Sequence, residues 1–232
     1  KGAIVTITNY GAIITSFTIK NNKGNDTELV LGFDKVEDYI SPAYLDGYAW
    51  MGCAVGRYAN RIKNAAFWLD GHTYALTKNN NNDQLHGGAG GFDRRVWKPG
   101  LYTDSVLELS YSSPDGEEGF PGNLDVVIRF ELTDGNELSY TYTATTDQPT
   151  PVNLTHHSYF NFHNGNGTIL DHEVKIHGHH LLEQGENFVT NGHILDVKDT
   201  AYDMSEFKKV KDGLPFYDFS YVTDKGITDE PV

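Results

Sequence analysis

The stretch VVIRFELTDGNELSYTYTA, residues 126–144, decides the fold. Apolar residues occupy every second position on both sides of the tripeptide Asp134-Gly135-Asn136, and charged or hydroxyl side chains fill most positions between them. A period of two places successive side chains on opposite faces of a strand, and an Asp-Gly pair suits a tight turn. The stretch therefore predicts a β-hairpin with one buried face.

Similar alternation recurs along the chain, at Leu107–Tyr111, around the Asp70-Gly71 turn and at Val174–Ile176. The only helix that the pattern supports is a short one near Asp34–Tyr39. Two antiparallel sheets packed face to face are the usual way to bury so many half-apolar strands. We therefore predict an all-β fold, a large antiparallel β-sandwich.

The chain has 232 residues with no internal repeat or linker, so we expect a single domain over residues 1–232. Its 18 basic and 32 acidic side chains give a formal net charge of -14, which repels phosphate backbones and anionic lipids. Nucleic acid and membranes are therefore not expected partners. No apolar stretch could cross a bilayer, and we expect a cytoplasmic protein, with a periplasmic or secreted location left open. The single cysteine, Cys53, lies in an apolar run and predicts a small buried residue.

Two segments contain more polar and glycine residues than a sandwich needs. The first, GCAVGRYANRI at residues 52–62, ends in Asn60 and Arg61, whose donors and acceptors suit sugar hydroxyls. From this segment alone, a solvated surface ion pair at Arg61 is an equal alternative. The second, LHGGAGGFDRRVW at residues 85–97, begins with His86, and its glycines would let backbone approach a ligand. It lacks the Lys and Ser/Thr of a phosphate loop, and a flexible turn with an exposed histidine is the alternative.

Histidines define two further segments. In PVNLTHHSYFNF, residues 151–162, strand geometry points His156 and His157 to opposite faces, so only one of them can face a given site. A histidine there could act as a general acid near neutral pH, and taken singly it is more often a hydrogen-bonded structural residue. His177 and His179 share a face of the strand expected there, but no third ligand lies near, so we expect no metal site.

Three of these segments, residues 52–62, 85–97 and 151–162, occur in the order found in the aldose 1-epimerase (galactose mutarotase) family. They resemble its motifs nearly residue for residue. The turn EGFPGNL at Glu118–Leu124 and the segment Thr190–Leu195 resemble two more of its motifs. The similarity extends from about Tyr10 to Tyr202. It implies a fold of large antiparallel sheets that binds a small monosaccharide. It also implies interconversion of the α and β anomers of free hexoses, galactose or glucose, by acid/base ring opening and closure without a cofactor.

Carried over by position, Asn60 and Arg61 resemble the family's substrate-binding residues, and His86 resembles a histidine that contacts ring-side oxygens. His157, directly before Ser-Tyr-Phe, resembles the general acid. The family's general base is a glutamate far toward the C-terminus. We expect it beyond Val232, in a chain truncated at its C-terminus and slightly at its N-terminus.

Three questions stay open from the sequence. Asp218 lies in a setting similar to that of the family's sugar-binding aspartate, but it is not assigned. Without the base, the chain could be a non-catalytic carbohydrate-binding module. A sugar-phosphate epimerase would need more basic residues than Arg57, Arg94 and Arg95, and the acidic balance of the chain argues against it.

Overall fold

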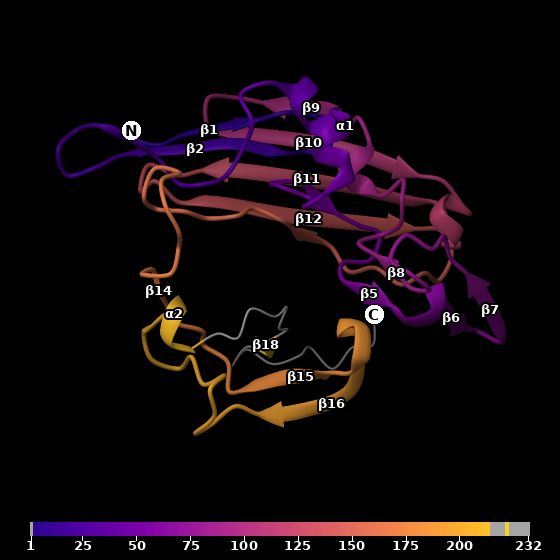
Figure 1. Cartoon of the computed structure of the whole chain (residues 1–232). Helices are drawn as coiled ribbons and strands as arrows, with labels where there is room; N and C mark the ends of the chain where they lie inside the picture. The colour runs from indigo at the N-terminus through magenta and orange to yellow at the C-terminus, as the bar shows by residue number, and fades with distance from the viewer. Residues whose placement is uncertain (1, 214–220, 223–232) are drawn as a thin grey trace. The chain divides into compact units, whose positions relative to one another are not determined.

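The structure is a computed structural model that describes residues 2–213 and 221–222 (Figure 1). The chain divides into two compact units, Lys1–Asn166 and Gly167–Val232, and each is described by itself. Strands dominate both units. The expectation of a single domain stays a prediction.

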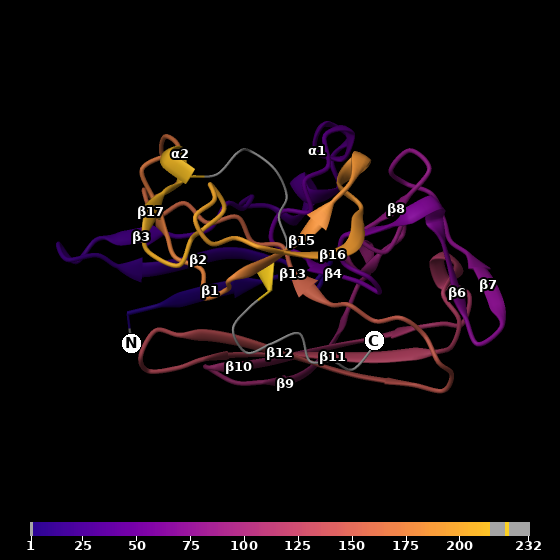
Figure 2. The same ribbon diagram turned by 90° about the horizontal axis from the view of Figure 1, so that it is seen from below.

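Two antiparallel sheets form the first unit's main body. Figure 2 shows β1 and β2 as one layer over the four-stranded layer of β9 to β12. Their strands are β1 (Ile4–Ile7), β2 (Ile14–Lys20) and β3 (Asp26–Glu28) in one sheet, and β9 (Lys98–Tyr102), β10 (Val106–Ser113), β11 (Leu124–Leu132) and β12 (Leu138–Thr146) in the other. Ile14 of the first sheet belongs to the same buried cluster as Leu109 and Ile128 of the second. The predicted β-sandwich is confirmed.

The hairpin predicted from residues 126–144 is β11–β12. Val126 pairs with Ala144 and Ile128 with Tyr142. On β11 the side chain of Ile128 is fully buried, whereas Arg129 is half-buried and Glu131 is exposed. The period of two therefore places one face of β11 in the core, as the alternation predicts.

Short paired elements carry the motif segments. They are β4 (Ala54–Val55) with β13 (Thr155–His156), β5 (Arg61–Ile62) with β8 (Gln84–Leu85), and β6 (Ala66–Leu69) with β7 (His72–Ala75). The last pair is the hairpin that the Asp70-Gly71 turn predicts. Short 3-10 helices also form: η2 (Lys63–Ala65) between β5 and β6, η3 (Phe92–Arg94) between β8 and β9, and η4 (Glu117–Gly119) between β10 and β11. Cys53 is buried, as expected.

The helix expected near Asp34–Tyr39 is present as η1 (Val36–Ile40). It is not the only helix, so that part of the prediction is wrong: α1 (Pro42–Asp46) and α2 (Val210–Gly213) also form. The helix α1 begins after Ser41, whose hydroxyl accepts a hydrogen bond from the Tyr44 N–H at 3.3 Å. A serine N-cap followed by proline at the first helical position is a signal for the start of a helix. A search for apolar residues at every second position does not detect this signal.

The second unit contains two small sheets. They comprise β14 (Glu173–Val174) with β17 (Lys208–Lys209), and β16 (Thr190–Asp196), β15 (His180–Gln184) and β18 (Tyr221–Val222) in that order. Also present is η5 (Glu186–Phe188). The strand expected over Val174–Ile176 ends at Val174, so His177 and His179 lie outside it and the prediction of a shared strand face is wrong. Over the described ranges, no three His, Cys, Asp or Glu side chains lie together as metal ligands would, and no helix could span a membrane.

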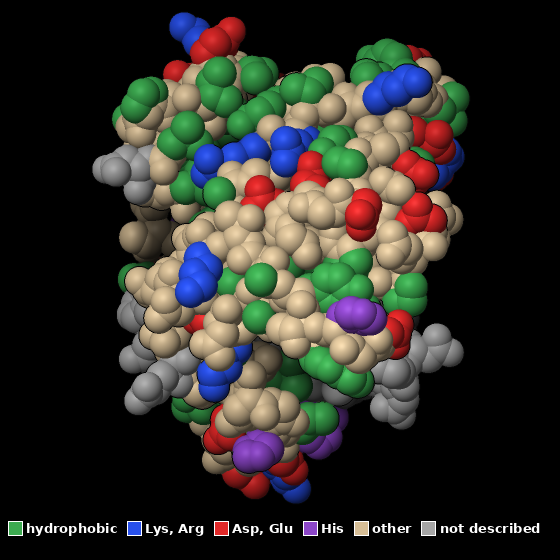
Figure 3. Space-filling model, turned by 90° about the vertical axis from the view of Figure 1, so that its right-hand side faces the viewer, with side chains coloured by type: hydrophobic (Ala, Val, Ile, Leu, Met, Phe, Trp, Pro, Cys, Tyr) green, Lys and Arg blue, Asp and Glu red, His purple; other side chains and the backbone are tan. Residues whose placement is uncertain are grey.

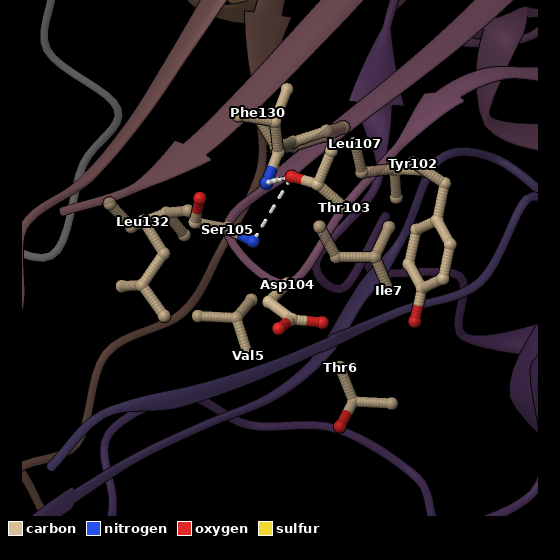
Figure 4. A pocket seen from close by; sticks show the side chains of 12 residues that line it. Val5, Thr6, Ile7, Tyr102, Thr103, Asp104, Ser105, Leu107, Phe130 and Leu132 are labelled. Carbon is tan, nitrogen blue, oxygen red and sulfur yellow. Dashed lines mark hydrogen bonds between the residues drawn. The ribbon is translucent and has the colours of Figure 1, made fainter. Parts of the chain in front are cut away.

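A cavity of about 470 Å³ lies between the sheets of the first unit, lined by Val5 and Ile7 of β1 and Phe130 of β11, among others (Figure 4). The Thr103 hydroxyl accepts hydrogen bonds from the N–H groups of Ser105 and Val106, which closes the turn at its edge. None of the predicted site residues lines this cavity, so it is separate from the candidate site.

The buried face of β11 predicts the effect of shortening a core side chain. Ile128→Ala should lower the free energy of unfolding by about 2–5 kcal/mol, because it removes buried methyl groups and leaves a cavity. Thr141→Ala, on an exposed position of β12, should change it little. Chemical denaturation measures both values. Equal effects would contradict the assignment of the buried face.

Candidate active site

The pairing of β5 with β8 brings Asn60 and His86 together. Asn60 directly precedes β5 and His86 directly follows β8 in an antiparallel pair, so the two residues lie opposite each other. The backbone N–H of His86 donates to the Asn60 carbonyl at 2.9 Å, and the backbone N–H of Asn60 donates to the ring nitrogen Nδ1 of His86 at 3.0 Å. Both residues have positive φ angles, 66° and 53°. Such backbone strain concentrates at functional sites, and here it fixes the imidazole of a half-buried histidine.

The contact with Asn60 sets the protonation state of His86. Since Nδ1 accepts a hydrogen bond, the neutral ring carries its proton on Nε2, which is then its free donor. Burial, with smaller contributions from the nearby His157 and Arg61, lowers the pKa of His86 to about 3. At neutral pH the ring is therefore an uncharged hydrogen-bond donor.

Arg61, the first residue of β5, is half-buried beside Asn60. Its Nη1 donates to the Asn60 Oδ1 at 3.0 Å. Because this bond occupies the amide oxygen, the amide nitrogen of Asn60 remains as a donor. The pair therefore combines an amide and a guanidinium, two side-chain types whose N–H donors suit the hydroxyl oxygens of a sugar.

Pairing between β4 and β13 places His157 near His86. The backbone N–H of His157 donates to the Cys53 carbonyl, and the backbone N–H of Gly52 donates to the His157 carbonyl, both at 2.9 Å. The imidazole rings of His157 and His86 have centroids 5.2 Å apart at an interplanar angle of 84°. Three motif segments that are distant in sequence thus meet around these two rings.

His156 has different neighbours. Its Nε2 lies 3.2 Å from the Ala12 carbonyl, and its Nδ1 lies 3.2 Å from the Ser158 hydroxyl. Its ring packs against Tyr140 and Phe130 of the four-stranded sheet, and burial lowers its pKa to about 4. The two consecutive histidines therefore face different surroundings, as strand alternation predicts, and the contacts of His156 are those of a packed structural residue.

The glycines after His86 pack closely against other parts of the protein, and their interpretation as a ligand-binding loop stays a prediction. A Cβ at Gly87 would lie 1.8 Å from the Gly56 carbonyl oxygen, and one at Gly88 would lie 2.1 Å from Glu118 Oε2. The Gly90 N–H donates to Glu118 Oε1 at 2.9 Å. These glycines are required because the loop packs against its own protein, with the carboxylate of the EGFPG turn as its anchor. His86 is half-buried, which differs from the exposed histidine of the flexible-turn alternative.

Aromatic rings that were not predicted from the sequence line one side of this site. The Trp50 ring contacts the His86 ring at 4.8 Å between centroids, and the Tyr48 ring contacts Trp50 at the same distance. The Tyr48 hydroxyl donates to Asp93 Oδ2 at 2.7 Å. A cluster of aromatics directly before the Gly52–Ile62 motif was the available signal. Asp218 lies outside the described residues.

The lowered pKa of His86 predicts a pH effect on stability. Between about pH 6.5 and pH 3 the unfolded chain binds a proton at His86 that the folded chain does not, so the free energy of unfolding falls as the pH falls through this range. A His86→Gln variant should lose less stability on acidification. Nitrogen NMR should show the Nε2–H tautomer of His86 at pH 5, and a protonated ring there would contradict the assignment.

The chain is similar to known proteins over most of its length. The profile of the family described as aldose 1-epimerase matches residues 1–232. The chain is 44% identical over 201 residues to galactose mutarotase of Bos taurus, covering 86% of this chain and 57% of that protein. It is 37% identical over 207 residues to aldose 1-epimerase of Escherichia coli K12, covering 89% of this chain and 58% of that protein. The chain thus spans less than two thirds of the length of both relatives.

Solved structures give the same result. An aldose epimerase homologue from C. elegans matches with a TM-score of 0.85 and 31% identity, over 91% of this chain and 63% of that chain. Galactose 1-epimerase from Lactobacillus acidophilus NCFM matches with a TM-score of 0.82 and 25% identity, over 99% of this chain and 68% of that chain. With its motifs, its fold and the match over its whole length, this chain belongs to the aldose 1-epimerase family.

Proposed function

We propose that the protein carrying this chain interconverts the α and β anomers of a free hexose, galactose or glucose, by acid/base ring opening and closure. The observation that carries the proposal is the contact between His157 and His86, 5.2 Å between ring centroids, beside Asn60 and Arg61. Family membership and the names of the relatives support the same reaction. We also retain the expected cytoplasmic location as a proposal.

His157 is the general acid in this proposal. It gives a proton to the ring oxygen O5 as the C1–O5 bond breaks, while a base takes the proton of the C1 hydroxyl and its electrons form the aldehyde C=O. Rotation about C1–C2 presents the other face of the aldehyde, and the reverse proton transfers close the ring. The resemblance implies a glutamate as the base. Only protons move, so the chemistry needs no cofactor.

His86 contributes a hydrogen bond rather than a proton. Its Nε2–H is a neutral donor whose direction is fixed by the Asn60 N–H at Nδ1, so it can hold an oxygen on the ring side of the sugar. Asn60 and Arg61 donate to neighbouring hydroxyls. Placement of the sugar by these three residues would set O5 within reach of His157.

A sugar-phosphate substrate fits less well. Arg57 is buried and donates to the carbonyl of Pro121, Arg94 lies 3.5 Å from Asp93, and Arg95 pairs with Glu117 at 2.9 Å. These arginines already have partners within the protein. On the face drawn in Figure 3, acidic side chains lie among the basic ones, which does not favour a phosphate group.

The acid assignment predicts different effects at two consecutive residues. His157→Asn should reduce the rate of anomer exchange by about 10²- to 10⁴-fold, because an amide does not release a proton near neutral pH, whereas His156→Asn should keep most of the rate. Polarimetry of freshly dissolved α-glucose and α-galactose, with and without a chelator, measures the rate, and circular dichroism checks that both variants are folded. Equal losses would contradict the assignment. Sugar binding without exchange in the unmodified protein would instead favour a non-catalytic carbohydrate-binding module.

Arg61→Lys tests the sugar-binding role of the guanidinium. The lysine keeps the charge but loses the planar arrangement of donors, so kcat/KM for galactose should fall by about ten- to a hundredfold. Arg129→Lys, on β11 and paired with Glu108, is the control and should leave kcat/KM unchanged. An unchanged value in Arg61→Lys would favour the alternative of a surface ion pair.

A further inference from the structure

A row of aromatic and imidazole rings in the first unit leads to the two histidines. Successive ring centroids are between 4.8 and 5.2 Å apart. The rings belong, in order, to Phe33, Tyr44, Tyr48, Trp50, His86, His157 and Tyr159. Trp50 is the aromatic neighbour of His86 in this row, and neither the family motifs nor the proposed proton transfers use it.

We propose that Trp50 is a positioning residue for His86, which holds the imidazole in one orientation and keeps water from it, so that Nε2–H remains a neutral donor to the sugar. This inference rests on the proposed function and adds a residue to the same site. Trp50 acts through His86 and is not assigned a contact with the sugar.

The backbone of Trp50 is the first observation in favour. Its φ angle is 50°, a left-handed conformation that is a rare outlier for so bulky a side chain. Its carbonyl accepts hydrogen bonds from the Cys53 N–H at 3.3 Å and from Cys53 Sγ at 3.1 Å. The next residue, Met51, donates its N–H to the Tyr44 hydroxyl at 2.8 Å. The surrounding chain therefore imposes a strained conformation on Trp50, as is typical of functional sites.

The second observation is the anchoring of the ring that contacts Trp50. Tyr48 donates its hydroxyl to Asp93 Oδ2 at 2.7 Å, and Asp93 is fully buried. The Arg94 guanidinium lies over the Tyr48 ring, 4.7 Å from its centroid. Because a hydrogen bond and a cation–π contact hold Tyr48, the Trp50 ring has a fixed neighbour in addition to His86. Its edge-to-face contact with His86, at 69°, is thereby fixed as well.

The third observation concerns what protonation of His86 would disturb. The groups facing its imidazole are the Asn60 N–H, the Trp50 ring, Arg61 and His157. Burial is the largest cause of the lowered pKa of His86, so removal of the Trp50 ring would let water in and raise that pKa toward its ordinary value of 6.5. A proton on Nδ1 would then oppose the Asn60 N–H and break the contact that orients the ring.

The experiment compares Trp50→Leu and Trp50→Phe with Trp68→Leu, a tryptophan on β6 that is 71% exposed. NMR follows the titration of His86 without sugar, and polarimetry follows the pH profile of kcat/KM. Trp50→Leu should raise the pKa of His86, move the acidic limb of the profile to higher pH and lower kcat/KM about tenfold at pH 6. Trp50→Phe should restore most of both values because an aromatic ring remains, and Trp68→Leu should change neither.

A folded Trp50→Leu variant with an unchanged His86 titration and an unchanged pH profile would overturn the inference. If Trp50→Leu does not fold, Tyr48→Phe decides, since it keeps the ring but loses the hydrogen bond to Asp93. A smaller shift in the same direction supports the inference, and no shift overturns it. If the unmodified protein shows no anomer exchange, the proposed function fails, while the His86 titration still tests the role of Trp50 separately.

Discussion

The candidate site depends on one short antiparallel pairing, between the backbone of residues 52–55 and that of residues 155–157. It joins two segments far apart in the chain and aligns His157 with the strand that leads to Asn60. The strand residues Cys53, Ala54 and Val55 are buried almost completely, so the pairing is shielded from water. Backbone hydrogen bonds in such a buried position are costly to break. Without this pairing, His157 would have no fixed position relative to His86.

Buried polar contacts extend this arrangement to the glycine-rich loop. Arg57 follows β4, is 2% exposed, and donates to the Ser113 hydroxyl and to the carbonyls of Pro114 and Pro121. A buried guanidinium is stable only with such a set of acceptors. Glu118, in the turn beside these acceptors, holds the loop through Gly90. The motifs are thus rich in charge and glycine partly because these residues hold the loops around the site.

Local pattern was enough to predict the parts of the fold that local geometry controls. The β11–β12 hairpin follows from alternation and a turn, and the different surroundings of His156 and His157 follow from the same period. The helix α1 could also have been predicted, since Ser41-Pro42 is a start signal. The aromatic cluster before the Gly52–Ile62 motif was a signal for Trp50, but its contact with His86 could not have been predicted, because that contact depends on how a loop packs against the β5–β8 pair. For His177 and His179, alternation over three residues was too short to specify a strand.

The structure also separates the roles of the two histidines in the proposed mechanism. A general acid must hold a proton that it can release and recover, whereas His86 has its single proton on Nε2 and accepts a backbone N–H at Nδ1. To become an acid at neutral pH, His86 would need a second proton. Burial and its neighbours His157 and Arg61 oppose that protonation. A neutral His86 in turn places no positive charge 5.2 Å from the ring of His157 when that ring is protonated. In the proposed mechanism the acid role therefore falls to His157, and the fixed tautomer of His86 suits a donor that orients the sugar without exchanging protons.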